Sequence, residues 1–227
     1  LPTALTFNRN THDGRHISDP EVRAARALTK RLEARGVTVT GRAAMAPAPG
    51  GLDVVARLRS QRLATLVRYT NRRSDNFFAE VLGKALGAEV YGRPGTIAKG
   101  AAALRAWAEL TNVGIVARDS SGLSYDNRIS PRGMTRLLTV AAAEPWGGTL
   151  REGLPSGGQG TLENRLERIP VRAKTGTLEN ISALSGWVWL RRRETWAEFS
   201  IISRGMPKTT AARLEDRVVR IVNRHGG

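Results

Sequence analysis

Two short polar motifs in this chain carry residue types suited to proton relay and anion binding. Lys174-Thr175-Gly176 lies between two strand-like segments, and Ser74-Asp75-Asn76 interrupts a run of helical patterns. A lysine inside an apolar strand costs desolvation energy unless it has a partner or a function. A hydroxyl and an amide on a connection between helices lie where functional groups are common. These two motifs are therefore the first candidates for a site.

The strand motif suits the recognition of an extended peptide. Strand alternation predicts Lys174 and Gly176 on one face and Thr175 and Thr177 on the other. A glycine beside the lysine lets a ligand backbone approach, and an edge strand can pair with a peptide. Lys174 would supply positive charge, Thr175 or Thr177 would bind a terminal carboxylate, and the Thr177 N–H could face an oxyanion. The alternative is a solvent-facing lysine in an ordinary hairpin.

The helix motif has a functional and a structural interpretation. In the first, Ser74 relays a proton to a leaving amine and Asn76 binds the substrate amide. In the second, Ser74 or Asp75 caps the helix predicted over 77–86. Both can hold, because a capping loop is rigid.

A nucleophile of the Ser-x-x-Lys type is missing from the printed sequence. The five lysines are Lys30, Lys84, Lys99, Lys174 and Lys208, and none has a serine three residues before it. The chain has no cysteine, which excludes disulfides, thiolate metal sites and a cysteine nucleophile. The three histidines lack metal-ligand spacing, so the sequence predicts neither a metal nor a cofactor.

The net charge of +16 favours contact with anionic surfaces. The arginines are scattered, with no basic stripe interleaved with aromatic residues, so specific nucleic-acid binding is disfavoured. Lipid headgroups or wall polymers are the preferred anionic partners. No apolar stretch approaches the ~20 residues of a membrane span.

The elements follow an order of helices first and strands last. Asp19 and Pro20 open a helix that ends at Gly36, and further helices are expected over 61–70, 77–86, 97–110 and 131–143. Short strands are expected over 3–7, 37–41 and 52–60. The last third predicts antiparallel strands over 171–177, 182–190 and 196–203, then an amphipathic helix over 209–224. This order predicts an α+β fold with the final helix on one face of the sheet.

Five segments in order resemble the class C low-molecular-mass penicillin-binding proteins. They cover nearly all of the chain, at residues 17–41, 69–87, 119–134, 154–166 and 171–188. That family comprises D-alanyl-D-alanine carboxypeptidases and endopeptidases of the bacterial cell wall, whose nucleophile lies in a Ser-x-x-Lys motif. The resemblance implies a transpeptidase-like (β-lactamase-like) domain, an antiparallel sheet flanked by helices, often with domains inserted after the nucleophile motif.

The resemblance assigns roles residue by residue. Ser74 and Asn76 match the second family motif, and Lys174-Thr175-Gly176 matches the third. The implied catalytic residues are Ser74, Asn76 and Lys174. The implied substrate-binding residues are Thr175, Gly176 and Thr177. The Thr177 N–H falls at the oxyanion position. Residues 120–124 match a family loop in which Ser120 replaces a glycine, and Asn127 nearby is a rival for the amide-binding role.

The missing motif leads to an expectation about the whole protein. Residues 1–17 would be the tail of an inserted domain or linker, and residues 18–227 the C-terminal part of the transpeptidase-like domain. A missing or separate N-terminal segment would carry the nucleophile, and the isolated chain would be inactive. The implied enzyme is exported, periplasmic or wall-associated, acts on peptidoglycan peptides ending in D-Ala-D-Ala, and binds β-lactams. The alternative function is a non-catalytic cationic wall-binding module.

Overall fold

The computed structural model describes residues 3, 6 and 8–226. By their contacts they form two compact units, one within residues 1–60 and the other within residues 61–227. Each unit is described by itself. No helix of the described residues is both long and apolar enough to span a bilayer.

The first unit contains one long helix and little else that is regular. Its elements are η1 (Asn8–Asn10), β1 (Thr11–His12), β2 (Arg15–His16) and α1 (Pro20–Glu33). The helix begins at Pro20 as predicted, and Asp19 occupies the N-cap position without a side-chain capping bond. The strand expected over 3–7 lies largely outside the described residues.

The strands predicted over 37–41 and 52–60 are wrong. Both segments are irregular and exposed, and Val55 and Leu58 are 97% and 99% exposed. Alternating apolar residues form a strand only where a neighbouring strand satisfies their backbone groups and one face is buried. Neither condition holds for these segments among the described residues.

The four helices predicted between residues 61 and 143 are present, two of them with different ends, and the structure adds a helix at Gly147–Gly153 and a short strand pair that were not predicted. The elements are α2 (Leu63–Arg73), α3 (Asn76–Tyr91), α4 (Ile97–Leu110), α5 (Pro131–Ala143), α6 (Gly147–Gly153) and the short η2 (Gly160–Leu162), with a small ladder of β3 (Ile115–Val116) and β4 (Arg128–Ile129). The predicted end of the 77–86 helix, just before Gly87, is wrong, because α3 continues to Tyr91. Gly87 instead lets α3 and α4 approach closely: a Cβ there would lie 2.5 Å from the backbone nitrogen of Gly100.

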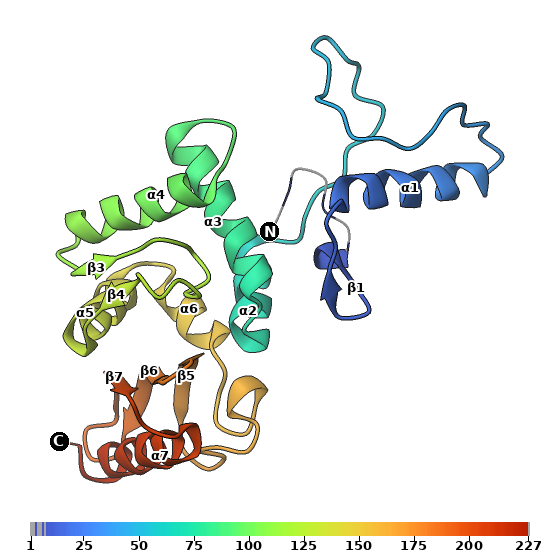
Figure 1. Ribbon diagram of the computed structural model, residues 1–227. Helices are drawn as coiled ribbons and strands as arrows, with labels where there is room; N and C mark the ends of the chain where they lie inside the picture. The colour runs from blue at the N-terminus through green and yellow to red at the C-terminus, as the bar shows by residue number, and fades with distance from the viewer. Residues whose placement is uncertain (1–2, 4–5, 7, 227) are drawn as a thin grey trace. The chain divides into compact units, whose positions relative to one another are not determined.

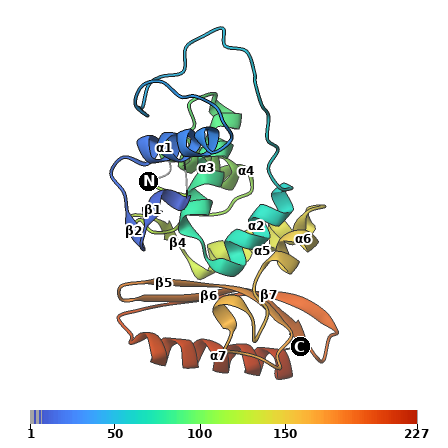
Figure 2. The same ribbon diagram turned by 90° about the vertical axis from the view of Figure 1, so that its right-hand side faces the viewer.

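A three-stranded antiparallel sheet forms the other layer of this unit. Its strands are β5 (Val171–Leu178), β6 (Ile181–Leu190) and β7 (Thr195–Arg204), in that order, and α7 (Lys208–His225) follows. Figure 1 and Figure 2 show α7 along one face of the sheet, with α2, α5 and α6 beyond the other. The predicted α+β architecture, with helices flanking an antiparallel sheet, is confirmed.

Each sheet face has its own apolar contacts. Toward α7, Val171, Ala173 and Leu184 pack with Val219 in the main core. Toward α5, Trp187 packs with Leu138 and is 1% exposed. Odd-numbered residues of β5 therefore face α7, and even-numbered residues, Lys174 among them, face the opposite side.

The close approach of α3 and α4 leads to a stability prediction. Gly87→Ala should lower the free energy of unfolding by about 1–3 kcal/mol, since the new methyl group would overlap the backbone of α4. Gly148→Ala in α6 is the matched control, because nothing lies within 4 Å of its Cβ position. The control should be neutral or stabilise by about 0.5–1 kcal/mol. Urea unfolding of both variants measures this, and equal effects would contradict the packing argument.

Candidate active site

Ser74 lies in the sharp connection between α2 and α3. It ends α2 in the left-handed conformation, with φ 52° and ψ 48°, which is uncommon for a residue with a side chain. Asp75 then caps α3 by accepting a hydrogen bond from the Phe78 N–H at 3.1 Å. The capping role therefore belongs to Asp75, and the Ser74 side chain remains available for another contact.

The Ser74 hydroxyl meets the lysine of the strand motif. Lys174 Nζ donates a hydrogen bond to Ser74 Oγ at 2.6 Å, although the two residues are 100 positions apart in the chain. Lys174 Nζ also donates to the Thr175 carbonyl oxygen at 2.8 Å, which fixes the ammonium above the strand. The fold thus joins the two motifs that the sequence singled out.

Burial and a second lysine lower the pKa of Lys174 to about 8. Burial disfavours the charged ammonium, and the positive charge of Lys208 adds to this effect. Lys208 Nζ donates to Ser182 Oγ at 2.9 Å and lies 3.5 Å from the Gly176 carbonyl oxygen. A lysine with this pKa is largely charged at neutral pH and can still exchange a proton with the adjacent hydroxyl.

Lys208 belongs to a charged network behind the sheet. Glu215, which is 1% exposed, accepts hydrogen bonds from Ser182 Oγ at 2.6 Å and from Arg165 Nη2 at 2.8 Å. Arg165 also pairs with Asp216 at 2.7 Å. These bonds connect α7 with the loop before β5 and with β6. They therefore support β5 from the α7 side of the sheet, opposite the Lys174 side chain.

Among the described residues, no strand pairs with the outer edge of β5, which has only the bridge between Arg172 and Ser156. The Ala173 N–H points away from β6 and donates to the Pro155 carbonyl oxygen at 3.0 Å. Strand alternation directs the backbone groups of Thr175 and Thr177 to the same edge. Thr177 is exposed and Thr175 is half-buried. The edge can therefore offer backbone donors and threonine hydroxyls to an extended ligand.

The other predicted site residues, Gly176 and Asn76, lie near Lys174 and Ser74 in the chain, but neither takes part in the hydrogen bonds of the Lys174 ammonium described above. Gly176 lies on β5 two residues after Lys174, and a Cβ there would come within 3.3 Å of the Ala183 side chain. Asn76 is the first residue of α3, two positions after Ser74, and its side chain is exposed. The structure therefore unites Ser74 with Lys174 directly and leaves Asn76 on the adjacent surface.

The loop at 119–127 supports the site and does not offer its amide to a ligand. Asn127 donates to Asp119 at 2.8 Å and accepts from the Arg118 N–H at 2.7 Å, so its amide is used within the loop. Burial opposes ionisation of Asp119, but hydrogen bonds, from Asn127 first, hold its pKa below the usual range. Asn127 is accordingly a poor rival to Asn76.

The sequence analysis did not predict the role of one supporting residue, Glu80. Glu80, buried on α3, accepts hydrogen bonds from the backbone N–H groups of Ser120 and Ser121 at 3.0 and 2.9 Å. It fixes the 119–127 loop to the helix that Asp75 begins. The position of Glu80 in the helix gives no sequence signal for this role, because its partners lie 40 residues later.

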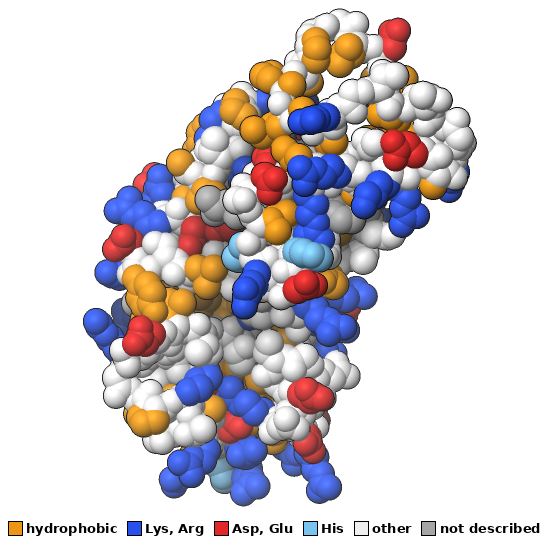
Figure 3. Space-filling view, turned by 45° about the vertical axis from the view of Figure 1, so that its right-hand side comes forward, with side chains coloured by type: hydrophobic (Ala, Val, Ile, Leu, Met, Phe, Trp, Pro, Cys, Tyr) orange, Lys and Arg blue, Asp and Glu red, His pale blue; other side chains and the backbone are white. Residues whose placement is uncertain are grey.

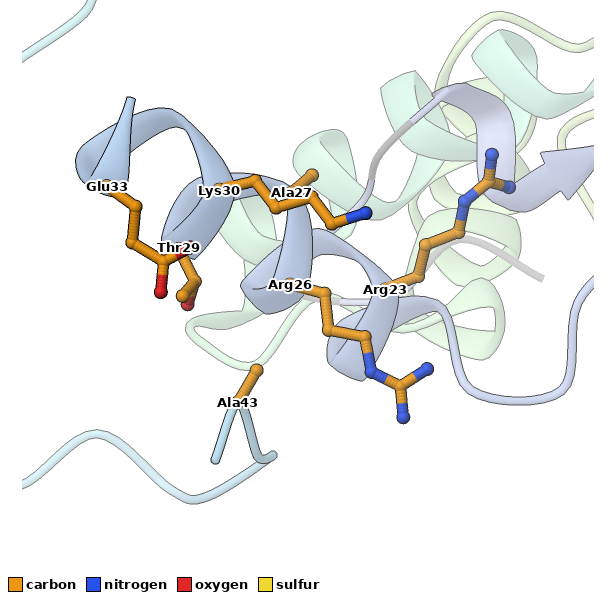
Figure 4. Close-up of a pocket in the computed structure, with 7 residues that line it drawn as sticks. All are labelled: Arg23, Arg26, Ala27, Thr29, Lys30, Glu33 and Ala43. Carbon is orange, nitrogen blue, oxygen red and sulfur yellow. The ribbon is translucent and has the colours of Figure 1, made fainter. Parts of the chain in front are cut away.

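One pocket is formed by residues of the first unit. It has a volume of about 440 Å³ and is lined by α1 residues and Ala43 of the first unit, in a largely cationic setting (Figure 4). Its α1 lining consists of Arg23, Arg26, Ala27, Thr29, Lys30 and Glu33. It contains none of the predicted site residues. Among the described residues no group of three or more His, Asp or Glu side chains is arranged to hold a metal ion.

Comparison with known proteins finds similar sequences among D-Ala-D-Ala carboxypeptidases. Residues 7–225 match the D-Ala-D-Ala carboxypeptidase 3 (S13) family. The chain is 30% identical over 220 residues to a D-alanyl-D-alanine carboxypeptidase of Actinomadura sp. (strain R39), covering 90% of this chain and 40% of that protein. It is 26% identical over 197 residues to the D-alanyl-D-alanine carboxypeptidase DacB of Haemophilus influenzae, covering 82% and 41%. The chain thus spans about 40% of the length of these relatives.

Solved structures support the same fold. Penicillin binding protein 4 (dacB) from Haemophilus influenzae superposes with a TM-score of 0.81 at 23% identity, covering 92% of this chain and 50% of that one. The same protein complexed with a β-lactam gives a TM-score of 0.74 at 22% identity, covering 92% and 51%. A class A β-lactamase from Bacteroides cellulosilyticus matches more distantly, with a TM-score of 0.51 at 20% identity, covering 71% and 62%. The predicted penicillin-binding, β-lactamase-like fold is confirmed.

The two-lysine arrangement leads to a prediction about charge. The pKa of Lys174 should lie near 8, so its charge should be lost as the pH rises through this value. Lys208→Met should raise that pKa toward the ordinary value, because it removes a positive charge that disfavours protonation. Titration of the lysine ammonium resonances by NMR measures both. Lys30→Met, in the other unit, is the control, and an unchanged Lys174 pKa in Lys208→Met would contradict the coupling.

Proposed function

The chain belongs to the D-Ala-D-Ala carboxypeptidase 3 (S13) family, and on that premise we propose that it forms part of a serine D-alanyl-D-alanine carboxypeptidase or endopeptidase. The substrates would be peptidoglycan stem peptides ending in D-Ala-D-Ala, and β-lactams would bind as their analogues. The observation that carries this proposal is the 2.6 Å hydrogen bond from Lys174 to Ser74, formed between two motifs of such enzymes.

The proposed roles follow from the position of each group. An extended peptide would lie along the open edge of β5, with its terminal carboxylate near Lys174 and the hydroxyl of Thr175 or Thr177. The absence of a Gly176 side chain keeps the peptide close to the strand. The Thr177 N–H would stabilise the oxyanion, and Asn76 would bind a substrate amide.

Proton transfer would pass through Ser74. When the acylated serine forms and the peptide bond breaks, the departing D-Ala amine needs a proton. Ser74 Oγ would donate it and recover a proton from Lys174 Nζ, its hydrogen-bond partner. The pKa of about 8 suits this exchange, because proton transfer is efficient when the two states are close in energy.

The nucleophile would come from a different segment. The printed sequence has no Ser-x-x-Lys, and the chain spans about 40% of the relatives it matches. We therefore propose that an N-terminal segment of the same protein carries that motif and completes the site. Residues 1–17 would then be the tail of an inserted domain or linker, and residues 18–227 the C-terminal part of the catalytic domain.

The compartment and the alternative function follow from the same premise. An enzyme acting on wall peptides would be exported and would work in the periplasm or at the wall. A purely non-catalytic wall-binding module is not favoured, because the sequence relatives are carboxypeptidases. A buried lysine hydrogen-bonded to a serine is also costly for a surface whose only task is binding.

Lys174→Ala in the completed enzyme should slow acylation by a β-lactam. Loss of a preorganised electrostatic group costs about 2.7–4 kcal/mol in comparable sites, or roughly 10²–10³ in rate. Stopped-flow acylation kinetics measure the effect, with Lys30→Ala as the matched control. A change below about threefold would reduce Lys174 to a structural residue.

A labelled penicillin should not become covalently attached to this polypeptide alone. Co-expression with the N-terminal segment should restore labelling, and the label should be found on that segment. Fluorescence on a denaturing gel, followed by peptide mapping, measures the outcome. A covalent band at the mass of this chain would mean that Ser74 or another serine here is the nucleophile.

A further inference from the structure

The outer face of α7 carries a row of arginines that the catalytic proposal does not use. Arg213, Arg217, Arg220 and Arg224 are all exposed, and their spacing of four, three and four residues places them on one side of the helix. With a rise of about 1.5 Å per residue, the row extends roughly 16 Å.

The row continues onto the neighbouring turn. Arg191, Arg192 and Arg193 are exposed between β6 and β7, and the Arg191 N–H donates to the Asn223 carbonyl oxygen at 3.1 Å. This bond holds the turn against the last turns of α7. Figure 3 shows Lys and Arg side chains gathered at the lower end of the molecule, where α7 lies in Figure 1.

No acidic side chain of α7 offsets this charge at the surface. The two acids of the helix, Glu215 and Asp216, are 1% and 8% exposed and are paired with Arg165 on the inner side. The fold therefore sorts the charges of one helix, with the acids inward and the arginines outward. Such a face attracts anions at short range, and salt weakens this attraction by screening the charges.

Two aliphatic side chains border the arginine row. Leu214 and Ile221 are 44% and 50% exposed and stand seven residues apart on the same flank of the helix. A polyanion in water gains nothing from exposed leucine and isoleucine. A bilayer surface does, because apolar side chains enter the headgroup region while arginines contact the phosphates.

We propose that the arginine face of α7, together with the Arg191–Arg193 turn, docks this protein onto the surface of an anionic lipid bilayer. Lys174 extends from the opposite side of the sheet to α7, as the packing of Val171 and Ala173 against Val219 requires. Docking through α7 consequently leaves the Ser74–Lys174 side directed away from the lipid. This proposal goes beyond the catalytic one and does not depend on it.

The test is co-sedimentation of the chain with vesicles at low and physiological salt. Phosphatidylcholine vesicles containing phosphatidylglycerol should bind it, vesicles of phosphatidylcholine alone should not, and salt should weaken the binding. Each basic residue near an anionic bilayer strengthens binding roughly fivefold. Changing the four α7 arginines together to glutamine should therefore lower partitioning at least about tenfold.

Two further variants make the test specific. A control in which Arg26, Lys30, Arg31 and Arg35 become glutamine removes the same charge from exposed positions of the first unit, and it should change partitioning by less than about twofold. Leu214→Ser with Ile221→Ser should weaken vesicle binding but leave binding to soluble polyphosphate unchanged. Circular dichroism checks that each variant is folded.

Three outcomes would overturn the proposal. One is the absence of binding to anionic vesicles. Another is an equal loss of vesicle binding in the α7 variant and in the first-unit control variant, which would show that net charge alone causes the effect. The third is vesicle binding that is insensitive to Leu214 and Ile221 and matched by polyphosphate, which would identify an anionic polymer as the partner.

Discussion

The hydrogen bond between Lys174 and Ser74 is the contact on which the candidate site depends. It joins a strand to a helix connection that lies 100 residues earlier, and it gives a buried ammonium a partner that offsets part of its desolvation cost. The left-handed backbone at Ser74 and the Asp75 cap fix one end of this bond. The β5–β6 ladder fixes the other. Both ends are held by rigid elements, which is the condition for a preorganised site.

The charges behind the sheet extend the same constraint. Glu215 and Asp216 are buried on α7 and require Arg165, and Glu215 in turn accepts the Ser182 hydroxyl that Lys208 contacts. Lys208 lies close to the carbonyl oxygen of Gly176, and its positive charge adds to the effect of burial in lowering the pKa of Lys174. A buried carboxylate on the far face of the sheet is thereby linked to the proton affinity of the site. Because Glu215 and Asp216 are buried, the charged side chains on the outer face of α7 are all basic.

Sequence patterns predicted the elements well where local and tertiary preferences agree. Apolar periodicity gave α4, α5, α7 and the three-strand ladder, because each pattern is also the buried face of its element. They failed at 37–41 and 52–60, where alternating residues have no sheet to join. They failed also at Gly87, since glycine is both a helix terminator and a means of close helix contact. Only the neighbouring Gly100 distinguishes the two.

The sequence by itself determined which residue types stand in the two motifs, the family they resemble, and the absence of a Ser-x-x-Lys among the printed residues. The tertiary structure decided which motif residues meet: Ser74 contacts Lys174, whereas Asn76 faces solvent and the amide of Asn127 is used within its own loop. It also decided the proton affinity of Lys174 and the roles of Glu80 and Lys208. The physical reason is that burial and electrostatic coupling arise from neighbours in space, 26 to 100 residues apart in the chain, and no local pattern encodes them.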